Sequence, residues 1–387
     1  MSGAGSGSGS GNAKLHKFAR MGKKDYLCTA IGMKIVRGIL VILNVLVAVA
    51  LVVSTLAATV SPSRSIVPSL AAYGYLPLLA ANVLMVVVWV MLKPWYSLIS
   101  VAAVAARWMF VGLFVQVAGL GGAPVKAEGA AEVRLMSYNV HLFRGRGAKA
   151  GSTDSVAQGF LRLTDEWKPE VLCLQEFALP KRVKVVDSLL VRGYNHYYAT
   201  NTSAKGMPYG TVVFSKLPIT YVNRIDGEKL LVELMCEEGR FRVCNVHMGS
   251  YHFDEADWQE LDRVKHGDVS ASLKRTLDKV RSAVLDHEKA WEQKLRPIVE
   301  ESRLPLVLAG DLNDTPASWL YHQIDRHLDD TFCERGLGVG FTYNGGFPHY
   351  RIDAIFHSKG LRTLAHKRVR SHLSDHYPVV ATLELVP

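Results

Sequence analysis

The chain has 387 residues, of which 49% are hydrophobic, and a mean hydropathy of +0.11, so it is too long for one average domain and too apolar for an ordinary soluble enzyme. This composition excludes a disordered or collagen-like chain. The five cysteines show neither an even count nor paired CxxC spacing, so neither a disulfide framework nor a zinc site is indicated.

The formal charge of +10 is concentrated near the N-terminus. Residues 1–37 carry seven Lys and Arg against Asp25, and residues 38–125 carry three basic and no acidic side chains. The remainder is therefore close to neutral. Such a balance does not demand a nucleic-acid-binding face, although a local basic groove is compatible with it.

Three long apolar stretches follow the basic tail. Residues 38–60 and 65–92 contain no charged residue, and 94–125 contains only Arg107. A membrane-spanning helix needs about 20 apolar residues, and each stretch is that long. We predict a flexible basic cytoplasmic tail over 1–33, with a Gly/Ser run at 2–11, and a transmembrane region of about three helices over 34–120.

The orientation follows from the positive charges that precede the first stretch, which predict a cytoplasmic N-terminus. Three crossings would place everything after about residue 125 on the extracytoplasmic side of a plasma (inner) membrane. The middle stretch carries Pro68, Gly74 and Pro77 and is also compatible with a re-entrant segment. An even number of crossings would place the same domain in the cytoplasm.

After a linker at 121–131, residues 132–387 change to short β-rich runs separated by polar and turn residues. Strands are predicted at 134–140, 170–175, 209–215, 230–236, 241–247, 304–310, 351–357 and 377–385, and helices at 152–167, 181–191, 268–300 and 316–326. Because the strands outnumber the helices and do not alternate strictly with them, we predict an α+β layered domain.

Several of these apolar runs stop abruptly at a carboxylate, an amide or an imidazole. The residues at these stops are Asn139, Glu176, Asn245, His247, Asp311, Asn313, Asp353, Asp375 and His376. If the runs are strands of stacked sheets, their ends gather along one edge. Oxygen-rich side chains with no matching Ser or Cys nucleophile favour a hard cation such as Mg²⁺ or Mn²⁺.

The ordered motifs resemble those of the endonuclease/exonuclease/phosphatase superfamily, which has the pancreatic-deoxyribonuclease-like fold, in a membrane-anchored bacterial type. The motifs are SYNV, LQE, YGTVVFSKLPI, VCNVH, GDLNDTP, RIDAIF and SDHYPV, and they cover essentially 132–387. The resemblance implies a four-layered α/β sandwich, with two packed mixed β-sheets flanked by helices. It also implies hydrolysis of phosphodiesters or phosphomonoesters in DNA, RNA, phosphoinositides or sphingomyelin.

The same resemblance implies roles for the residues at the metal and the general base. Glu176 matches the principal metal ligand, with Asn139 beside it, and Asp375 sits at the metal or stabilises the neighbouring histidine. His376 matches the histidine that activates water or holds the phosphate, and Asp353 the acid that hydrogen-bonds it. A carboxylate paired with an imidazole fixes the tautomer and raises its basicity, as a general base requires.

The remaining site residues also follow from the resemblance. His247 matches the second family histidine, which contacts phosphate and protonates the leaving group. Asp311 and Asn313 align water and bind phosphate, although Gly, Asp and Asn are favoured in turns in any case. Tyr209 and Asn245 are assigned to substrate binding, with aromatic packing as the alternative for Tyr209.

The predicted function is a membrane-anchored, Mg²⁺-dependent phosphoric-ester hydrolase that cleaves a lipid or lipid-linked phosphodiester by attack of a metal-positioned water. The near-neutral domain argues mildly against long nucleic acids. A membrane-attached nuclease acting on DNA or RNA is the alternative, and a catalytically silent binding scaffold is the alternative of another class. The charged segment 251–300 is predicted to be a solvated helix face, or else a lid or a membrane-facing element beside the strand ends. The expected partners are the substrate and the bilayer, with no protein partner evident.

Overall fold

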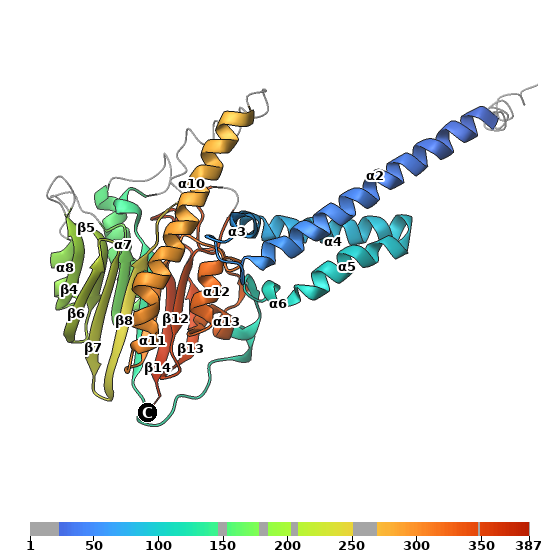
Figure 1. The fold of residues 1–387 in the computed structure, drawn as a ribbon. Helices are drawn as coiled ribbons and strands as arrows, with labels where there is room; N and C mark the ends of the chain where they lie inside the picture. The colour runs from blue at the N-terminus through green and yellow to red at the C-terminus, as the bar shows by residue number, and fades with distance from the viewer. Residues whose placement is uncertain are drawn as a thin grey trace, which may run out of the picture. The chain divides into compact units, whose positions relative to one another are not determined.

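A computed structural model describes residues 23–145, 153–177, 185–202, 208–250, 269–346 and 349–386 (Figure 1). The chain divides into two compact units. The first, here the helical unit, consists of Met1–Leu51 and Pro77–Ala106. The second, here the catalytic unit, consists of Val52–Leu76 and Arg107–Pro387, and it therefore includes the stretch between the first two apolar segments.

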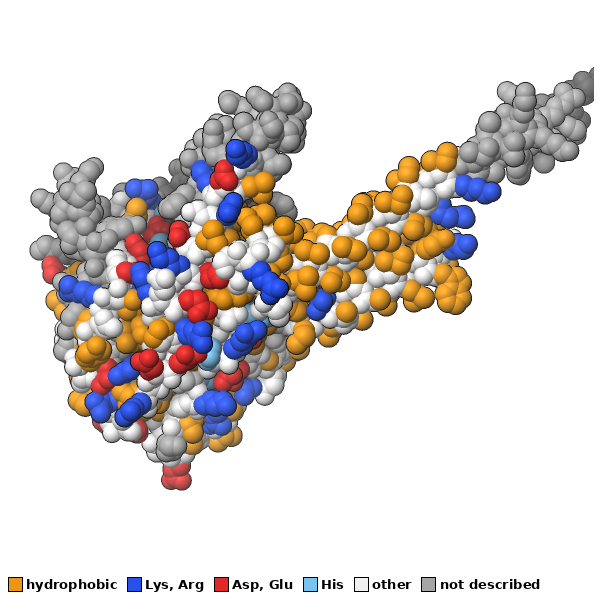
Figure 2. Space-filling model, in the orientation of Figure 1, with side chains coloured by type: hydrophobic (Ala, Val, Ile, Leu, Met, Phe, Trp, Pro, Cys, Tyr) orange, Lys and Arg blue, Asp and Glu red, His pale blue; other side chains and the backbone are white. Residues whose placement is uncertain are grey.

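The apolar segments form helices of unequal length. Their bounds are α2 (Lys23–Leu56), α3 (Ile66–Tyr73), α4 (Tyr75–Leu92), η1 (Pro94–Tyr96), α5 (Ser97–Ala106) and α6 (Trp108–Val111). Two helical segments, Gly32–Leu56 and Tyr75–Leu92, are long and apolar enough to cross a membrane, and Pro94–Ala106 is a shorter apolar stretch. Apolar side chains cover the surface of these helices (Figure 2). The number of crossings stays a prediction.

Within the helical unit, buried polar side chains join the helices. Ser100 Oγ lies 2.6 Å from Asn44 Oδ1, and Asn44 Nδ2 donates to the Tyr96 carbonyl at 2.8 Å. Asn82 Nδ2 donates to the carbonyls of Val47 and Leu78 at 3.1 and 2.9 Å. Such contacts hold helices together where water does not compete for the polar groups.

The middle and third apolar stretches are not single helices. Gly74, a weak helix former, separates α3 from α4, and Arg107 and Gly112 flank the four residues of α6. The expected linker at 121–131 is attached to the catalytic unit, because the Val125 carbonyl accepts from Arg362 Nη2 at 2.9 Å. Just upstream, β1 (Val115–Gln116) pairs with β11 (Gly338–Val339).

The catalytic unit contains two six-stranded mixed sheets. The first has the order β13-β14-β2-β3-β5-β4 and the second β10-β12-β9-β8-β7-β6. Their strands are β2 (Glu132–Asn139), β3 (Val171–Gln175), β4 (His196–Thr202), β5 (Pro208–Ser215), β6 (Ile219–Asp226), β7 (Lys229–Cys236), β8 (Gly239–His247), β9 (Leu306–Asp311), β10 (Asp329–Asp330), β12 (Asp353–His357), β13 (Leu361–Arg368) and β14 (Val379–Leu385). The β2–β3 and β8–β9 pairs are parallel, and the other pairs are antiparallel.

Three apolar clusters define four layers and confirm the predicted sandwich. The central cluster, which includes Leu135, Val232 and Val243, lies between the sheets. Phe160 and Leu189 pack α7 and α8 onto the first sheet, while Trp291 and Leu320 belong to the cluster that packs the helices of the second. These helices are α7 (Thr153–Trp167), α8 (Val185–Val191), α10 (Val269–Ala290), η6 (Trp291–Leu295), α11 (Arg296–Glu301) and α12 (Trp319–Asp325), with α13 (Thr331–Arg335) beside β12 and β13.

Strand register brings the polar strand ends to one edge. In the parallel pairs, Asn139 is opposite Gln175 and His247 is opposite Asp311, while Asp353 is opposite Asp311 in the antiparallel pair. Gly310 (φ +151°) makes this approach possible, because a Cβ there would lie 1.8 Å from the carbonyl oxygen of Val246. The ends of β2, β3, β8 and β9 therefore meet where the sequence predicts the site.

Candidate active site

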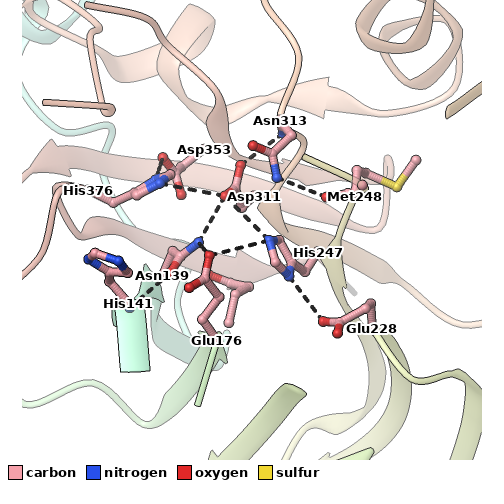
Figure 3. A network of polar contacts seen from close by, with 12 residues as sticks. Asn139, His141, Glu176, Glu228, His247, Met248, Asp311, Asn313, Asp353 and His376 are labelled. Atoms are coloured by element: carbon pink, nitrogen blue, oxygen red, sulfur yellow. Dashed lines mark hydrogen bonds and ion pairs between the residues drawn. The ribbon is translucent and has the colours of Figure 1, made fainter. Parts of the chain in front are cut away.

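Glu176 and Asn139 form one side of the site (Figure 3). Asn139 Nδ2 donates to Glu176 Oε1 and Asp311 Oδ2, both at 3.0 Å, while its Oδ1 accepts from the backbone N–H of His141 at 3.0 Å. Glu176 has the left-handed φ of +49° directly after β3, a strained conformation that turns the chain at the end of the strand. Its side chain keeps 26% exposure, so it is open to a hydrated ion.

His376, Asp353 and Asp311 form the opposite side. His376 Nδ1 lies 2.9 Å from Asp353 Oδ2, and its Nε2 lies 3.7 Å from Asp311 Oδ2. Burial lowers the pKa of His376, but the carboxylates of Asp353 and Asp311 outweigh it and raise that pKa well above its ordinary value. Burial, with Asp353 adding to it, raises the pKa of Asp311. The pKa values of Asp311 and His376 therefore both depend on the charge of neighbouring carboxylates.

His247 is held by a residue that the sequence analysis missed. Its Nδ1 lies 3.0 Å from Glu228 Oε2, and its backbone N–H donates to the Glu228 carbonyl at 2.8 Å. Burial lowers the pKa of His247, but Glu228 and Asp311 together outweigh it, so the pKa is raised. Glu228 lies between β6 and β7 and carries no local motif, so only the pairing of β7 with β8 identifies it.

Asn313 and Asp375 flank the central residues. The backbone N–H of Asn313 donates to Asp311 Oδ1 at 2.8 Å, and its Nδ2 donates to the Met248 carbonyl at 2.8 Å. Asp375 Oδ1 lies 3.3 Å from His141 Nδ1. His141 is thus a further residue that the sequence analysis did not single out, although it directly follows the SYNV motif.

One of the two predicted substrate contacts, Asn245, stands apart from this group. Asn245 has no exposed surface, and it joins the two sheets because its Oδ1 accepts from Gln175 Nε2 at 2.7 Å and its Nδ2 donates to the carbonyls of Leu174 and Val212. The expectation that Asn245 contacts substrate is therefore corrected: it lies behind the site. Tyr209 belongs to β5, but its side chain lies outside the described residues.

The residues present fit a divalent cation. Among the described residues, Asp311, Asp353 and His376 offer ligand atoms within 4.8 Å of one another. Nε2 of His247 and Oδ1 of Asp353 are buried with no hydrogen-bond partner among the described residues. The Glu176 carboxylate and the Asn139 amide offer the oxygen ligands that hard cations prefer. The Glu176 side chain is also more exposed than the buried side chains of Asp311 and Asp353, so it is the carboxylate most accessible to an ion.

Comparison with known protein families identifies the fold. Residues 136–376 match the model described as the Endonuclease/Exonuclease/phosphatase family. The chain belongs to this family. Members act as phosphodiesterases, nucleases or phosphatases and depend on a divalent metal, so the chain is a hydrolase of phosphate esters. Residues 37–114 match a second model, described as a domain of unknown function.

Individual relatives are distant. DNA-(apurinic or apyrimidinic site) endonuclease 2 of Mus musculus is 28% identical over 153 residues, which cover 39% of this chain and 27% of that protein. The chain thus spans about a quarter of that relative's length. Similar solved structures include an endonuclease/exonuclease/phosphatase from Beutenbergia cavernae (21% identity, TM-score 0.46, 66% of this chain and 72% of that chain) and the human Nocturnin catalytic domain (17%, 0.47, 68% and 97%).

This arrangement supports hydrolysis by complementary groups. A bound divalent ion supplies charge that stabilises the phosphoryl oxygens. Asp353 holds the imidazole of His376 in a fixed orientation and raises its basicity, so that in its neutral form His376 is suited to accept a proton from water. Glu228 holds His247, and the raised pKa of His247 suits it to donate a proton to a leaving oxygen.

Proposed function

We propose that this enzyme is a membrane-anchored, Mg²⁺-dependent phosphodiesterase that acts on a lipid or lipid-linked phosphate ester at the bilayer surface. One observation carries the substrate class. The connector, residues 57–74, joins the end of α2 to the start of α4 and packs within the catalytic unit. The unit that holds the site therefore includes the chain between two apolar helices.

The connector binds the catalytic unit at several points. The backbone N–H and the Oγ of Ser63 both donate to the Glu288 carboxylate at 2.7 Å, and the hydroxyl of Tyr73 donates to Asp314 Oδ1 at 2.7 Å. Pro62 and Ser69 line one small internal space together with His287 of α10. These contacts support a connector and a site on the same side of any membrane that α2 crosses.

This placement supports an extracytoplasmic site. With the basic tail in the cytoplasm, the end of α2 lies on the far side, and the connector and the catalytic unit lie there with it. After α4 the chain has to cross again, over residues 94–111. In support, Phe114 stacks on Tyr75, the first residue of α4, with ring centroids 5.2 Å apart, and Phe110 lies 6.0 Å from the same ring. Residues 110–114 therefore lie beside the N-terminal end of α4.

We expect reporters at the two ends of the chain to read opposite sides of the membrane. A phosphatase or fluorescent reporter fused after Pro387 should read extracytoplasmic, and one fused before the basic tail should read cytoplasmic. A matched fusion within the turn at Lys93 should also read cytoplasmic. A cytoplasmic signal from the C-terminal fusion would contradict three crossings.

A nuclease is the alternative, because the mouse relative is named a DNA endonuclease. Against it, the charge of the chain lies mainly in the first 37 residues and not in the catalytic portion. Nucleic-acid binding normally rests on many Lys and Arg contacts to phosphates. The lipid hydrolase and the nuclease therefore differ in the surface around the site, because a nuclease needs many Lys and Arg side chains there to bind phosphates.

The deciding experiment compares substrates for the full-length enzyme in detergent micelles or nanodiscs, with Mg²⁺ and then with EDTA. The panel is phosphoinositide and sphingomyelin vesicles, plasmid DNA, RNA and bis-(p-nitrophenyl) phosphate. We expect EDTA-sensitive cleavage of a lipid substrate and none of plasmid. Plasmid or RNA cleavage without lipid cleavage would replace the proposal with the nuclease. No turnover of any substrate would favour the silent scaffold.

A further inference from the structure

Tyr73, the last residue of α3, contacts both sides of the active-site edge. Its hydroxyl donates to Asp314 Oδ1 at 2.7 Å, and its ring meets the ring of Tyr350 edge-on, with centroids 6.3 Å apart and planes at 86°. Asp314 follows the turn that carries Asp311 and Asn313, and Tyr350 precedes Asp353. One connector side chain thus touches the two segments that hold the central carboxylates.

On the first side, Asp314 is the centre of a buried hydrogen-bond network. Asp314 is 3% exposed and His287 of α10 is 1% exposed. Asp314 Oδ2 lies 3.2 Å from His287 Nδ1, and His287 Nε2 lies 2.8 Å from the Gly249 carbonyl. Gly249 follows Met248, whose carbonyl accepts from Asn313 Nδ2. The network therefore links the connector to Asp314, which follows Asn313, and through His287 to the Met248–Gly249 segment that binds the Asn313 side chain.

On the second side, Tyr350 leads to His376 and Asp353. The backbone N–H of Tyr343 donates to the Tyr350 carbonyl at 2.9 Å, and the Tyr343 ring lies 5.3 Å from the His376 ring. Thr342 Oγ1 accepts from the backbone N–H of Asp353 at 2.9 Å. Tyr350 is therefore connected, through hydrogen bonds and a ring contact, to the loop that positions Asp353 and His376.

We propose that Tyr73 is a positioning residue of the active site, through which the connector between the two apolar helices fixes the turn 311–314 against the loop 342–353. It does not touch the reacting atoms. Its hydroxyl restrains Asp314, and its ring restrains Tyr350. The consequence is that full catalytic geometry requires the connector, so a fragment that begins after residue 125 lacks part of the support of its own site. This inference rests on the proposed hydrolase activity of that site.

The test is Tyr73→Phe in the full-length enzyme, with bis-(p-nitrophenyl) phosphate as a small substrate that needs no lipid recognition. The variant keeps the ring and loses only the hydroxyl. Because small misplacements of catalytic groups are costly, we expect kcat to fall about 10-fold while KM changes less than about 2-fold. Asp314→Ala should lower kcat at least as much, and adding Tyr73→Phe to it should cost little more, because the Tyr73 hydroxyl then has no Asp314 acceptor left to lose.

The matched control is Tyr194→Phe. Tyr194 is a buried tyrosine whose hydroxyl, like that of the half-buried Tyr73, donates a hydrogen bond, here to the Pro169 carbonyl at 2.6 Å, but it lies in the cluster of the first sheet and its outer helices. Its loss should lower thermal stability without lowering kcat. Equal kcat for Tyr73→Phe and the wild type would overturn the proposal, as would fully additive effects of Tyr73→Phe and Asp314→Ala.

Hydrogen exchange provides a readout that is independent of activity. Tyr73→Phe should increase amide exchange in 311–316 and 342–353, whereas Tyr194→Phe should leave these segments unchanged. If the wild-type enzyme hydrolyses nothing, the proposed function fails, and the exchange experiment still decides whether Tyr73 positions the site. Unchanged exchange in both segments would overturn the positioning role.

Discussion

Replacing Glu176 with glutamine is expected to lower kcat by at least about 10³-fold, which corresponds to about 4 kcal/mol of lost transition-state stabilisation. The substitution keeps the shape and the hydrogen bond from Asn139 but removes the negative charge that binds a divalent cation. Because Glu176 is partly exposed at the end of β3, the fold should be unaffected. Activity against a Mg²⁺ titration, with circular dichroism for the fold, measures both effects.

The control is Glu166→Gln, an exposed glutamate on α7 in the same domain, which should retain wild-type activity. Calorimetric titration of the Glu176→Gln protein should show weakened Mg²⁺ binding. Wild-type turnover in Glu176→Gln would remove this residue from the metal site and direct attention to the group formed by Asp311, Asp353 and His376.

Replacing His376 with alanine is expected to lower kcat by at least about 10²-fold, the lower end of the range for general acid–base groups. The same range applies to His247. The exposed His372, four residues before His376, provides the control, and His372→Ala should be indistinguishable from the wild type. Little loss of activity in His376→Ala, with the fold intact, would give His376 a structural role.

The pH dependence of kcat/KM tests the role of His376 in a second way, because the direction of its shift in a variant can be predicted. Since Asp353 is the foremost group raising the pKa of His376, Asp353→Asn should lower that pKa. A base works in its neutral form, so the acidic limb of kcat/KM should move to lower pH in Asp353→Asn, even as the maximal rate falls. A limb that stays in place would show that another group controls it.

The sequence predicted the central strands and missed the edges. All eight predicted strands occur, and they include the inner strands β2, β3, β8 and β9. Of the strands that were not predicted, β4, β6, β10 and β13 lie at sheet edges, and β1 and β11 form a separate two-stranded sheet. Edge strands pair on one side only and carry more polar side chains, so their hydrophobic pattern is weak.

Asn245 shows the limit of spacing as evidence. The apolar run of β8 stops at Asn245 and His247, and both were predicted to act at the site, Asn245 in substrate binding and His247 in catalysis. They do share a face of β8, but Asn245 is one step deeper, between the two sheets, where it bonds to Gln175. The sequence predicts which face a side chain occupies and does not predict its depth.

The family, the fold class and the strand ends at which Asn139, Glu176, His247, Asp311 and His376 gather could all be predicted from the sequence, because these features follow from local patterns in a fixed order. The pairing of individual side chains became clear only from the fold. Glu228 meets His247 through a strand register, and Tyr73 meets Asp314 across 241 residues of chain. Contacts between distant segments depend on how whole layers pack, and no local pattern encodes that.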